Sequence, residues 1–99
     1  MKLSMDELRT KLLDELDTVD WRALRGHLHR DSVIVVAPEL DLAEVACRVA
    51  RDCSAEVAGW IAGGQLRKPG QEELSAWERD MAKPFQVLIV APYVLIQAV

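Results

Sequence analysis

The stretch PFQVLIVAPYVLIQAV, from Pro84 to Val99, contains no charged side chain in sixteen residues. Valine, isoleucine, leucine, phenylalanine and tyrosine dominate it, a composition that favours β-strands. Pro92 interrupts the run and cannot donate a hydrogen bond to a neighbouring strand, so it marks a bend, a bulge or an exposed edge. The stretch therefore predicts strands near residues 85–91 and 93–98, or one long bent strand.

A second run of β-branched residues, SVIVVA (Ser32 to Ala37), is too short for a helix and ends at Pro38. Unbroken apolar runs of this length are typical of strands that are buried on both faces. The segments VIVVAP (Val33 to Pro38) and VLIVAP (Val87 to Pro92) match in residue type along their whole length. This match supports placing both segments in the middle of one sheet.

Five further segments show apolar residues at the three- and four-residue spacing of helices. Ser4 with Glu7 and Asp41 with Glu44 have the spacing of a capping box, which marks a helix start. The expected helices cover residues 4–16, a short stretch from Asp20 with Trp21, Leu24 and Leu28, a stripe from Leu42 to Val49, a segment from Asp52 or Ser54 to Gly63, and a segment with Leu74, Trp77 and Met81 after the loop Lys68-Pro69-Gly70. Trp21, Trp60 and Trp77 lie on these apolar stripes, so we expect them in the core.

This order of elements predicts an α+β fold, in which about five short helices pack on a small sheet of two or three strands. The length of 99 residues predicts a single globular domain over residues 1–99. Hydrophobic residues make up 51% of the chain, which is enough for a core and excludes a disordered tail. With 12 Lys and Arg against 16 Asp and Glu, the net charge is −4, so nucleic-acid binding is not expected.

The sequence also indicates a cytoplasmic protein. Acidic residues appear at Asp6 and Glu7 before any apolar run develops, which does not fit a signal peptide. No segment reaches the roughly 18–20 apolar residues of a membrane span. Cys47 and Cys53 are six positions apart and fit neither a CxxC motif nor a zinc site, so we expect two reduced thiols.

Three sets of polar residues could carry chemistry, and each has a simpler structural explanation. His27, His29 and Asp31 cluster in sequence, but two histidines at this spacing do not share a helix face and no second ligand group completes a metal site. Glycine-rich phosphate loops and nucleophile motifs are missing from the sequence. We therefore expect no metal, cofactor or catalytic residue, and the sequence leaves enzymatic activity open while favouring its absence.

The strand-end carboxylates Glu39 and Asp41 are the basis of an alternative function. Active sites of α/β folds often lie beside strand ends, and a basic face follows Trp21 nearby in sequence. That face comprises Arg22, Arg25, His27, His29 and Arg30. The alternative is a small-molecule binder or minor enzyme that uses these groups. Against it, Asp41 and Glu44 already have a role in starting a helix.

The uncharged C-terminal stretch favours protein interaction instead. An uncharged strand at a sheet edge pairs readily with another chain, so it needs a central position, a helical cover or a partner. A chain of this size buries only about 60–68% of its unfolded surface, which limits the cover it can provide for itself. We therefore expect a non-catalytic protein-interaction or self-associating module, most simply a homodimer formed through Tyr93, Val94, Leu95 and Ile96.

Several of these segments, in the same order, carry a resemblance to a known family. They are Asp20-Trp21, SVIVV (Ser32 to Val36), LDLAEVA (Leu40 to Ala46), Trp60 with Gly64, Trp77, and VAPYVLIQ (Val90 to Gln97). The chain resembles a bacterial family of small proteins known as domain of unknown function 2288. The resemblance implies a stand-alone bacterial cytoplasmic protein of this size. It implies no particular activity, cofactor or site residue.

Overall fold

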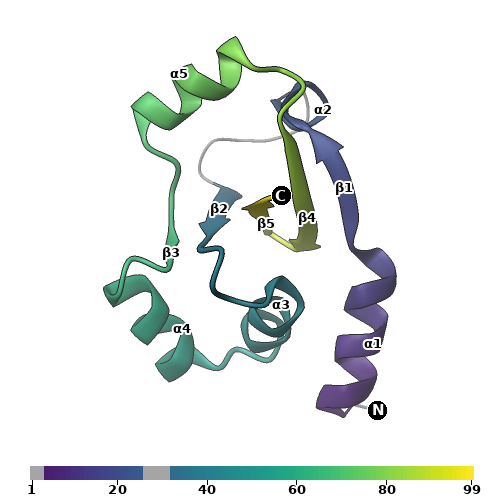
Figure 1. Ribbon diagram of the computed structural model, residues 1–99. Coiled ribbons are helices and arrows are strands. Elements are labelled where there is room, and N and C mark those ends of the chain that lie inside the picture. Colours follow the sequence, from purple (N-terminus) through teal and green to yellow (C-terminus); the bar gives the residue numbers. More distant parts are fainter. Residues whose placement is uncertain (1–3, 26–31) are drawn as a thin grey trace.

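A computed structural model describes residues 4–25 and 32–99 of the chain (Figure 1). Helices and strands alternate irregularly along the sequence. In chain order they are α1 (Met5–Glu15), β1 (Asp17–Asp20), α2 (Trp21–Arg25), β2 (Val33–Val36), α3 (Leu42–Ala50), α4 (Ser54–Ala62), β3 (Leu66–Arg67), α5 (Gln71–Arg79), β4 (Pro84–Val90) and β5 (Tyr93–Ala98).

The uncharged C-terminal stretch forms the middle of a mixed sheet with the strand order β1-β4-β5-β2-β3. β4 and β5 form an antiparallel hairpin, in which Phe85 faces Ala98 and Val90 faces Tyr93. The stretch is therefore two strands joined by a turn at Pro92 and not one bent strand. β2 runs parallel to β5, with Val33 opposite Val94. The two segments predicted to be central, which fall in β2 and β4, thus lie in one sheet on either side of β5.

The expectation of a two- or three-stranded sheet is wrong, because the sheet has five strands. The two strands missing from the prediction are the edges: β1 pairs with β4 and β3 pairs with β2. β1 has the sequence Asp-Thr-Val-Asp and β3 is only two residues long, so neither has a strand-like local pattern. Short, charged edge strands also discourage pairing with other chains. The α+β class and the five helices within residues 4–25 and 32–99 are as expected.

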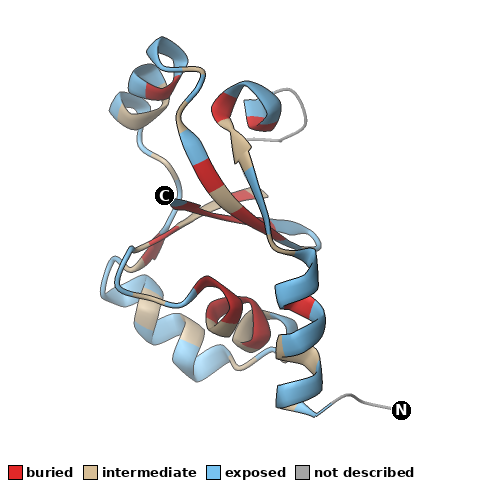
Figure 2. Ribbon diagram, turned by 45° about the vertical axis from the view of Figure 1, so that its right-hand side comes forward, coloured by how far each residue is buried: buried red, intermediate tan, exposed pale blue. Residues whose placement is uncertain are grey.

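Helices cover both faces of the sheet, which divides the core into two clusters (Figure 2). On one face, α1 and α3 pack against Leu88 and Leu95, and α3 contributes the largest share of buried residues. On the other face, α2 and α5 contribute Trp21, Leu24 and Trp77 around Phe85. Alternate residues of each central strand face opposite clusters, so both faces of β4 and β5 are used.

Helix starts follow the capping residues that the sequence predicts. Ser4 Oγ accepts a hydrogen bond from the Glu7 amide at 3.1 Å, and Asp41 Oδ1 accepts one from the Ala43 amide at 3.0 Å. Asp20 Oδ1 accepts from the Ala23 amide at 3.0 Å, which starts α2. At α4 the N-cap is Cys53, which lies between the two residues expected there and makes no capping hydrogen bond with its side chain.

Two of the three tryptophans form an aromatic cluster with Phe85. The ring centroids of Trp21 and Trp77 are 5.0 Å apart, as are those of Trp77 and Phe85. Both tryptophans are buried, as expected from their positions, whereas Trp60 is half-buried against the α3 side of the sheet. Tilted and edge-on ring pairs of this kind stabilise a core beyond simple burial. The predicted partner Leu28 lies outside the described residues.

One buried polar side chain connects the sheet to α3. Gln97 is 9% exposed, and its Nε2 donates to the backbone oxygens of Ala37 at 2.8 Å and Leu40 at 2.7 Å. These two carbonyls lie in the connection between β2 and α3. Hydrogen bonds to buried backbone oxygens satisfy groups that would otherwise be costly to bury. Gln97 therefore fixes the path of the chain from the sheet into α3.

Candidate functional site

The four residues predicted as an interface lie on the central strand β5. Val94, Leu95 and Ile96 are 8%, 1% and 0% exposed, because neighbouring strands and helices on both faces cover them. Tyr93, the first residue of the strand, is 43% exposed. The structure thus leaves Tyr93 as the member of this set with enough free surface to contact another molecule. Whether it contacts a second chain stays a prediction.

Of the two predicted carboxylates, Asp41 is engaged in an ion pair on the α3 side of the sheet. Asp41 caps α3 and also binds Arg9 of α1 through its other oxygen. Arg9 contacts Glu44 at 3.1 Å, and Glu44 in turn contacts Arg48 at 2.9 Å. The hydrogen bond from Arg9 lowers the pKa of Asp41 below its ordinary value. Glu39 is exposed in the turn before α3.

Within the described residues, Arg25 of the basic face does not share a site with Asp41. Arg25 pairs with Glu78 of α5 at 3.0 Å, on the face of the sheet opposite to Asp41 and α3. His27, His29, Arg30 and Asp31 lie outside the described residues. Among residues 4–25 and 32–99, no three histidine, cysteine or acidic side chains gather as they would around a metal ion.

The two cysteines are both unpaired thiols. Cys47 is buried in α3, and its burial, reinforced by the nearby charge of Glu44, raises the pKa of the thiol. A thiol with a raised pKa is a poor nucleophile at neutral pH. Cys47 therefore behaves as a small core residue, and Cys53 lies half-buried before α4.

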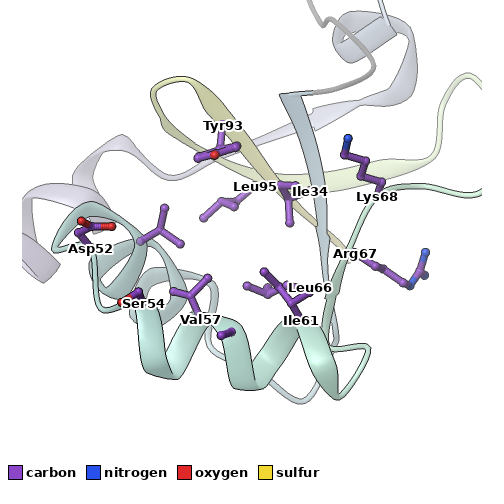
Figure 3. A pocket seen from close by; sticks show the side chains of 12 residues that line it. Ile34, Asp52, Ser54, Val57, Ile61, Leu66, Arg67, Lys68, Tyr93 and Leu95 are labelled. Carbon is purple, nitrogen blue, oxygen red and sulfur yellow. The ribbon is translucent and has the colours of Figure 1, made fainter.

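An apolar groove lies between α4 and the sheet (Figure 3). Its volume is about 440 Å³, within the range of ligand sites. The floor and walls are apolar side chains from α4 and from β2, β3 and β5. They are Val57, Ala58 and Ile61 of α4, with Val49 of α3, Ile34, Leu66, Leu95 and Tyr93. Ile61 is 59% exposed, so the groove is a concave site with solvent-accessible apolar surface.

The groove exists because α4 packs on the sheet only loosely. None of its residues is fully buried, and only Val57 and Trp60 reach the core. Asp52, in the connection from α3, has a φ of 57°, a left-handed conformation that aspartate tolerates better than most residues. At this turn the chain reverses direction, so that α4 runs along the edge of the sheet and the groove lies beside it.

The charged residues of the groove are at its two ends. Asp52 and Ser54 lie where α4 begins, and Arg67 and Lys68 lie at the opposite end (Figure 3). Arg67 forms two hydrogen bonds with the carboxylate of Glu73, one of them from Nη2 to Oε2 at 2.8 Å. This pair lowers the pKa of Glu73. The groove is therefore an apolar channel with an acidic and a basic end.

A second hollow, of about 680 Å³, lies between α2 and α5. Its lining is more polar and includes Arg25, Glu78 and Arg79. These groups already bind within the chain: Arg25 pairs with Glu78, and Arg79 Nε donates to the Ser75 oxygen at 3.3 Å. Trp21 Nε1, which is buried beside this hollow, finds no acceptor within the described part of the chain. The apolar groove is thus the better candidate for binding.

Sequence reasoning identified Tyr93 but missed the rest of the groove. Val57 and Ile61 are four positions apart and share a face of the helix that the sequence predicts there. It did not show that this face overhangs the sheet. The useful signal is that α4 carries more apolar side chains than its short contact with α3 can bury. The sequence assigns Lys68 only to a loop and assigns Arg67 to no element.

Comparisons with known proteins add family and fold. A family model described as "Protein of unknown function (DUF2288)" matches residues 7–98. A solved structure, the NMR solution structure of PA1075 from Pseudomonas aeruginosa, is similar with a TM-score of 0.74 and 37% sequence identity. The match covers 92% of this chain and 83% of that one. A search of curated protein sequences finds no significant match.

The described helices are short compared with the thickness of a lipid bilayer. Within the two described ranges, none is long and apolar enough to span a membrane.

Proposed function

The chain belongs to the family described as "Protein of unknown function (DUF2288)", and on that premise we propose that it is a non-catalytic protein-interaction module. It binds an apolar segment of a partner protein in the groove between α4 and the sheet. Because the family description assigns no activity, the proposal rests on geometry. The observation that carries it is the groove itself, where Ile61 and Tyr93 keep 59% and 43% of their surface exposed.

Exposed apolar surface in a concave setting is typical of interaction sites. The groove walls are aliphatic apart from the ring of Tyr93, and tyrosine is common among residues that dominate binding energy. A partner that covered the exposed part of Ile61 would gain about 1–2 kcal/mol from that side chain alone. These walls favour binding by burial of apolar surface over proton transfer. The ion-paired Asp41 and Glu44 lie outside the groove lining.

A comparison of two exposed isoleucines tests the proposal. Ile61 lines the groove, whereas Ile89 of β4 is 63% exposed and lies on the same face as Phe85 and Val87, opposite to the groove. Immobilised wild-type chain, Ile61→Glu and Ile89→Glu are each exposed to extract from a bacterium that encodes the protein, and bound proteins are quantified by mass spectrometry. We expect proteins that the wild type and Ile89→Glu retain and Ile61→Glu loses.

Because both side chains are largely exposed, each variant should keep the wild-type circular dichroism spectrum and melting temperature within a few degrees. A bound set that does not depend on Ile61 contradicts the proposal. The purified partner is then titrated by calorimetry. Burial of apolar surface predicts a negative heat-capacity change on binding.

Self-association is the form of the proposal that the sequence favoured. In that case a second copy occupies the groove, and Tyr93 contributes while Val94, Leu95 and Ile96 stay within the fold. Analytical ultracentrifugation at micromolar concentration separates the two kinds of partner. A dimer that Ile61→Glu dissociates identifies a second copy, and a monomer identifies a different protein.

The unpaired Cys47 and Cys53 support the proposed cytoplasmic location, since the cytoplasm keeps thiols reduced.

A further inference from the structure

Resting on the proposed function, we propose that α4 is a hinged wall of the groove. It swings away from the sheet to admit the apolar segment of the partner and then closes over it. Opening exposes the floor of the groove, which α4 helps to cover in the structure. Three features carry this inference: the weak anchoring of α4, the turns at its two ends and the burial of the groove floor.

Three of the described helices have nine residues each, and α4 is the most weakly anchored of them. α3 has five buried residues and α5 has one, Trp77, whereas α4 has none. Of the α4 residues, Val57 and Trp60 pack against the core, and both are half-buried. Segments with few buried apolar contacts open at a lower free energy than the whole fold unfolds. α4 is therefore the helix that can leave the sheet most easily.

Both ends of α4 have a residue in the left-handed backbone conformation. Asp52 precedes the helix with a φ of 57°, and Gly64 follows it with a φ of 75°. For aspartate the left-handed conformation is less favourable than the right-handed one, and glycine adopts both readily. Rotation at these residues reorients α4 and exchanges the hydrogen bonds of the Cys53 and Gln65 amides for bonds to water. Residues at the ends of elements commonly serve as hinges in this way.

The floor of the groove is buried while α4 is in place. Leu66 and Leu95 line the groove but are only 4% and 1% exposed. Val57 and Ile61 extend from α4 toward the sheet and cover this floor from one side (Figure 3). A segment that enters the closed groove therefore contacts mainly its walls. Because apolar affinity grows with the area removed from water, opening of α4 provides a larger binding surface.

Within the described ranges, one ion pair connects α4 to another helix. Arg48 Nε of α3 lies 3.3 Å from Glu56 Oε2, and the Glu56 side chain is 51% exposed. Arg48 also pairs with Glu44 at 2.9 Å, so it keeps a partner when Glu56 moves away. Pairs of exposed charges contribute little to stability. The Arg48–Glu56 pair is thus a weak latch, which holds α4 closed without locking it.

Hydrogen exchange of the free full chain, followed by NMR at single residues, tests the hinge. The amides of Val57 and Leu74 are matched, because each donates to the oxygen of its helix N-cap, Cys53 at 3.1 Å and Gly70 at 3.0 Å. After correction for intrinsic rates, we expect Val57 and the α4 amides that follow it to exchange at least about tenfold faster than Leu74 and the α5 amides that follow it. Equal exchange in the two helices overturns the proposal.

Two charge-neutralising variants test the latch. Glu56→Gln should speed exchange of the α4 amides about two- to threefold and leave those of α5 unchanged. Glu72→Gln is the matched control, because it removes the same charge from the first turn of α5, where Glu72 makes no ion pair within the described residues. It should leave α4 unchanged. Exchange of α4 that Glu56→Gln leaves unaltered, or that both variants alter equally, overturns the assignment of the latch.

Nile red, an uncharged apolar dye, tests whether the hinge serves the groove. Because α4 closes over a bound molecule, saturating dye should slow exchange of the α4 amides severalfold and leave α5 unchanged. Ile61→Glu should remove this protection. Absence of slowing at any dye concentration, or slowing that Ile61→Glu retains, overturns the link between the hinge and the groove.

The outcomes separate the hinge from the proposed function, because exchange in the free chain needs no partner. Slow exchange of α4 together with capture of proteins that depends on Ile61 overturns the hinge and leaves a rigid interaction groove. Fast exchange of α4 without such capture supports the hinge and overturns the proposed function.

Discussion

Replacing Gln97 by leucine should destabilise the fold although it makes the core more apolar. The side chain is 9% exposed, and its two hydrogen bonds fix the connection from β2 to α3. The Ala37 oxygen keeps a second donor, the Leu40 amide at 3.1 Å, but the Leu40 oxygen loses the amide of Gln97. An orphaned buried carbonyl costs about 1–3 kcal/mol, so we expect a loss of about 2 kcal/mol in the free energy of unfolding.

The measurement is urea unfolding followed by circular dichroism, together with thermal unfolding, where about 10 °C should be lost from the melting temperature. Gln86 is a matched control, because it sits directly opposite Gln97 on β4 and makes no side-chain hydrogen bond within the described residues. Gln86→Leu should change stability by less than about 0.5 kcal/mol. If both variants have the same stability, Gln97 does not fix the connection to α3.

Three further outcomes are expected. Leu88→Ala, at a fully buried position of β4, should lower the free energy of unfolding in urea by about 2–5 kcal/mol. Ile89→Ala, at the next and exposed position, should lower it by less than about 1 kcal/mol. Similar losses for both variants would refute the two-sided packing of this strand. The Arg9 hydrogen bond lowers the pKa of Asp41 in the folded state. The stabilising effect of this hydrogen bond is therefore complete above the unfolded pKa of about 4 and is lost as the pH falls through the folded pKa. Asp41→Asn keeps a capping side chain, so its urea midpoint should fall less between pH 6 and pH 3 than that of the wild type. In native protein, Ellman's reagent should modify Cys53 well before the buried Cys47. The variant Cys53→Ser should therefore react rapidly only after addition of urea. Rapid labelling of this variant without urea would contradict the burial of Cys47.

The elements that were predictable from the sequence are those with a strong local signal. β2 is an unbroken run of β-branched residues, and β4 and β5 are uncharged stretches rich in aliphatic residues. Ser4, Asp20 and Asp41 are capping residues at the helix starts where they were expected. These features depend on neighbouring residues alone. The expected core positions of Trp21 and Trp77 also follow from helical spacing.

The edge strands and the groove could not be predicted because they depend on contacts distant in sequence. The segment from Asp17 to Asp20 becomes a strand only because β4 supplies partners 64 to 70 positions away, from Pro84 opposite Asp20 to Val87 opposite Asp17. Leu66–Arg67 becomes a strand only beside β2. The groove depends on the angle at which α4 leaves α3, and the turn at Asp52 sets that angle. In the alternative function, Glu39 and Asp41 act together with a basic face; the sheet separates Asp41 from Arg25, the member of that face in α2, and this separation likewise depends on contacts distant in sequence.

The position of β5 has a consequence for folding during translation. Translation delivers β5 after every other strand, yet β2 and β4 are hydrogen-bonded to it on its two sides. Val33 and its partner Val94 are 61 positions apart (94 − 33), so at roughly 5–20 residues per second the inner edge of β2 waits about 3–12 s on the ribosome. During that interval a nascent chain exposes an aliphatic edge to chaperones and to neighbouring polysomes. The central sheet therefore cannot be completed until β5 has been synthesised.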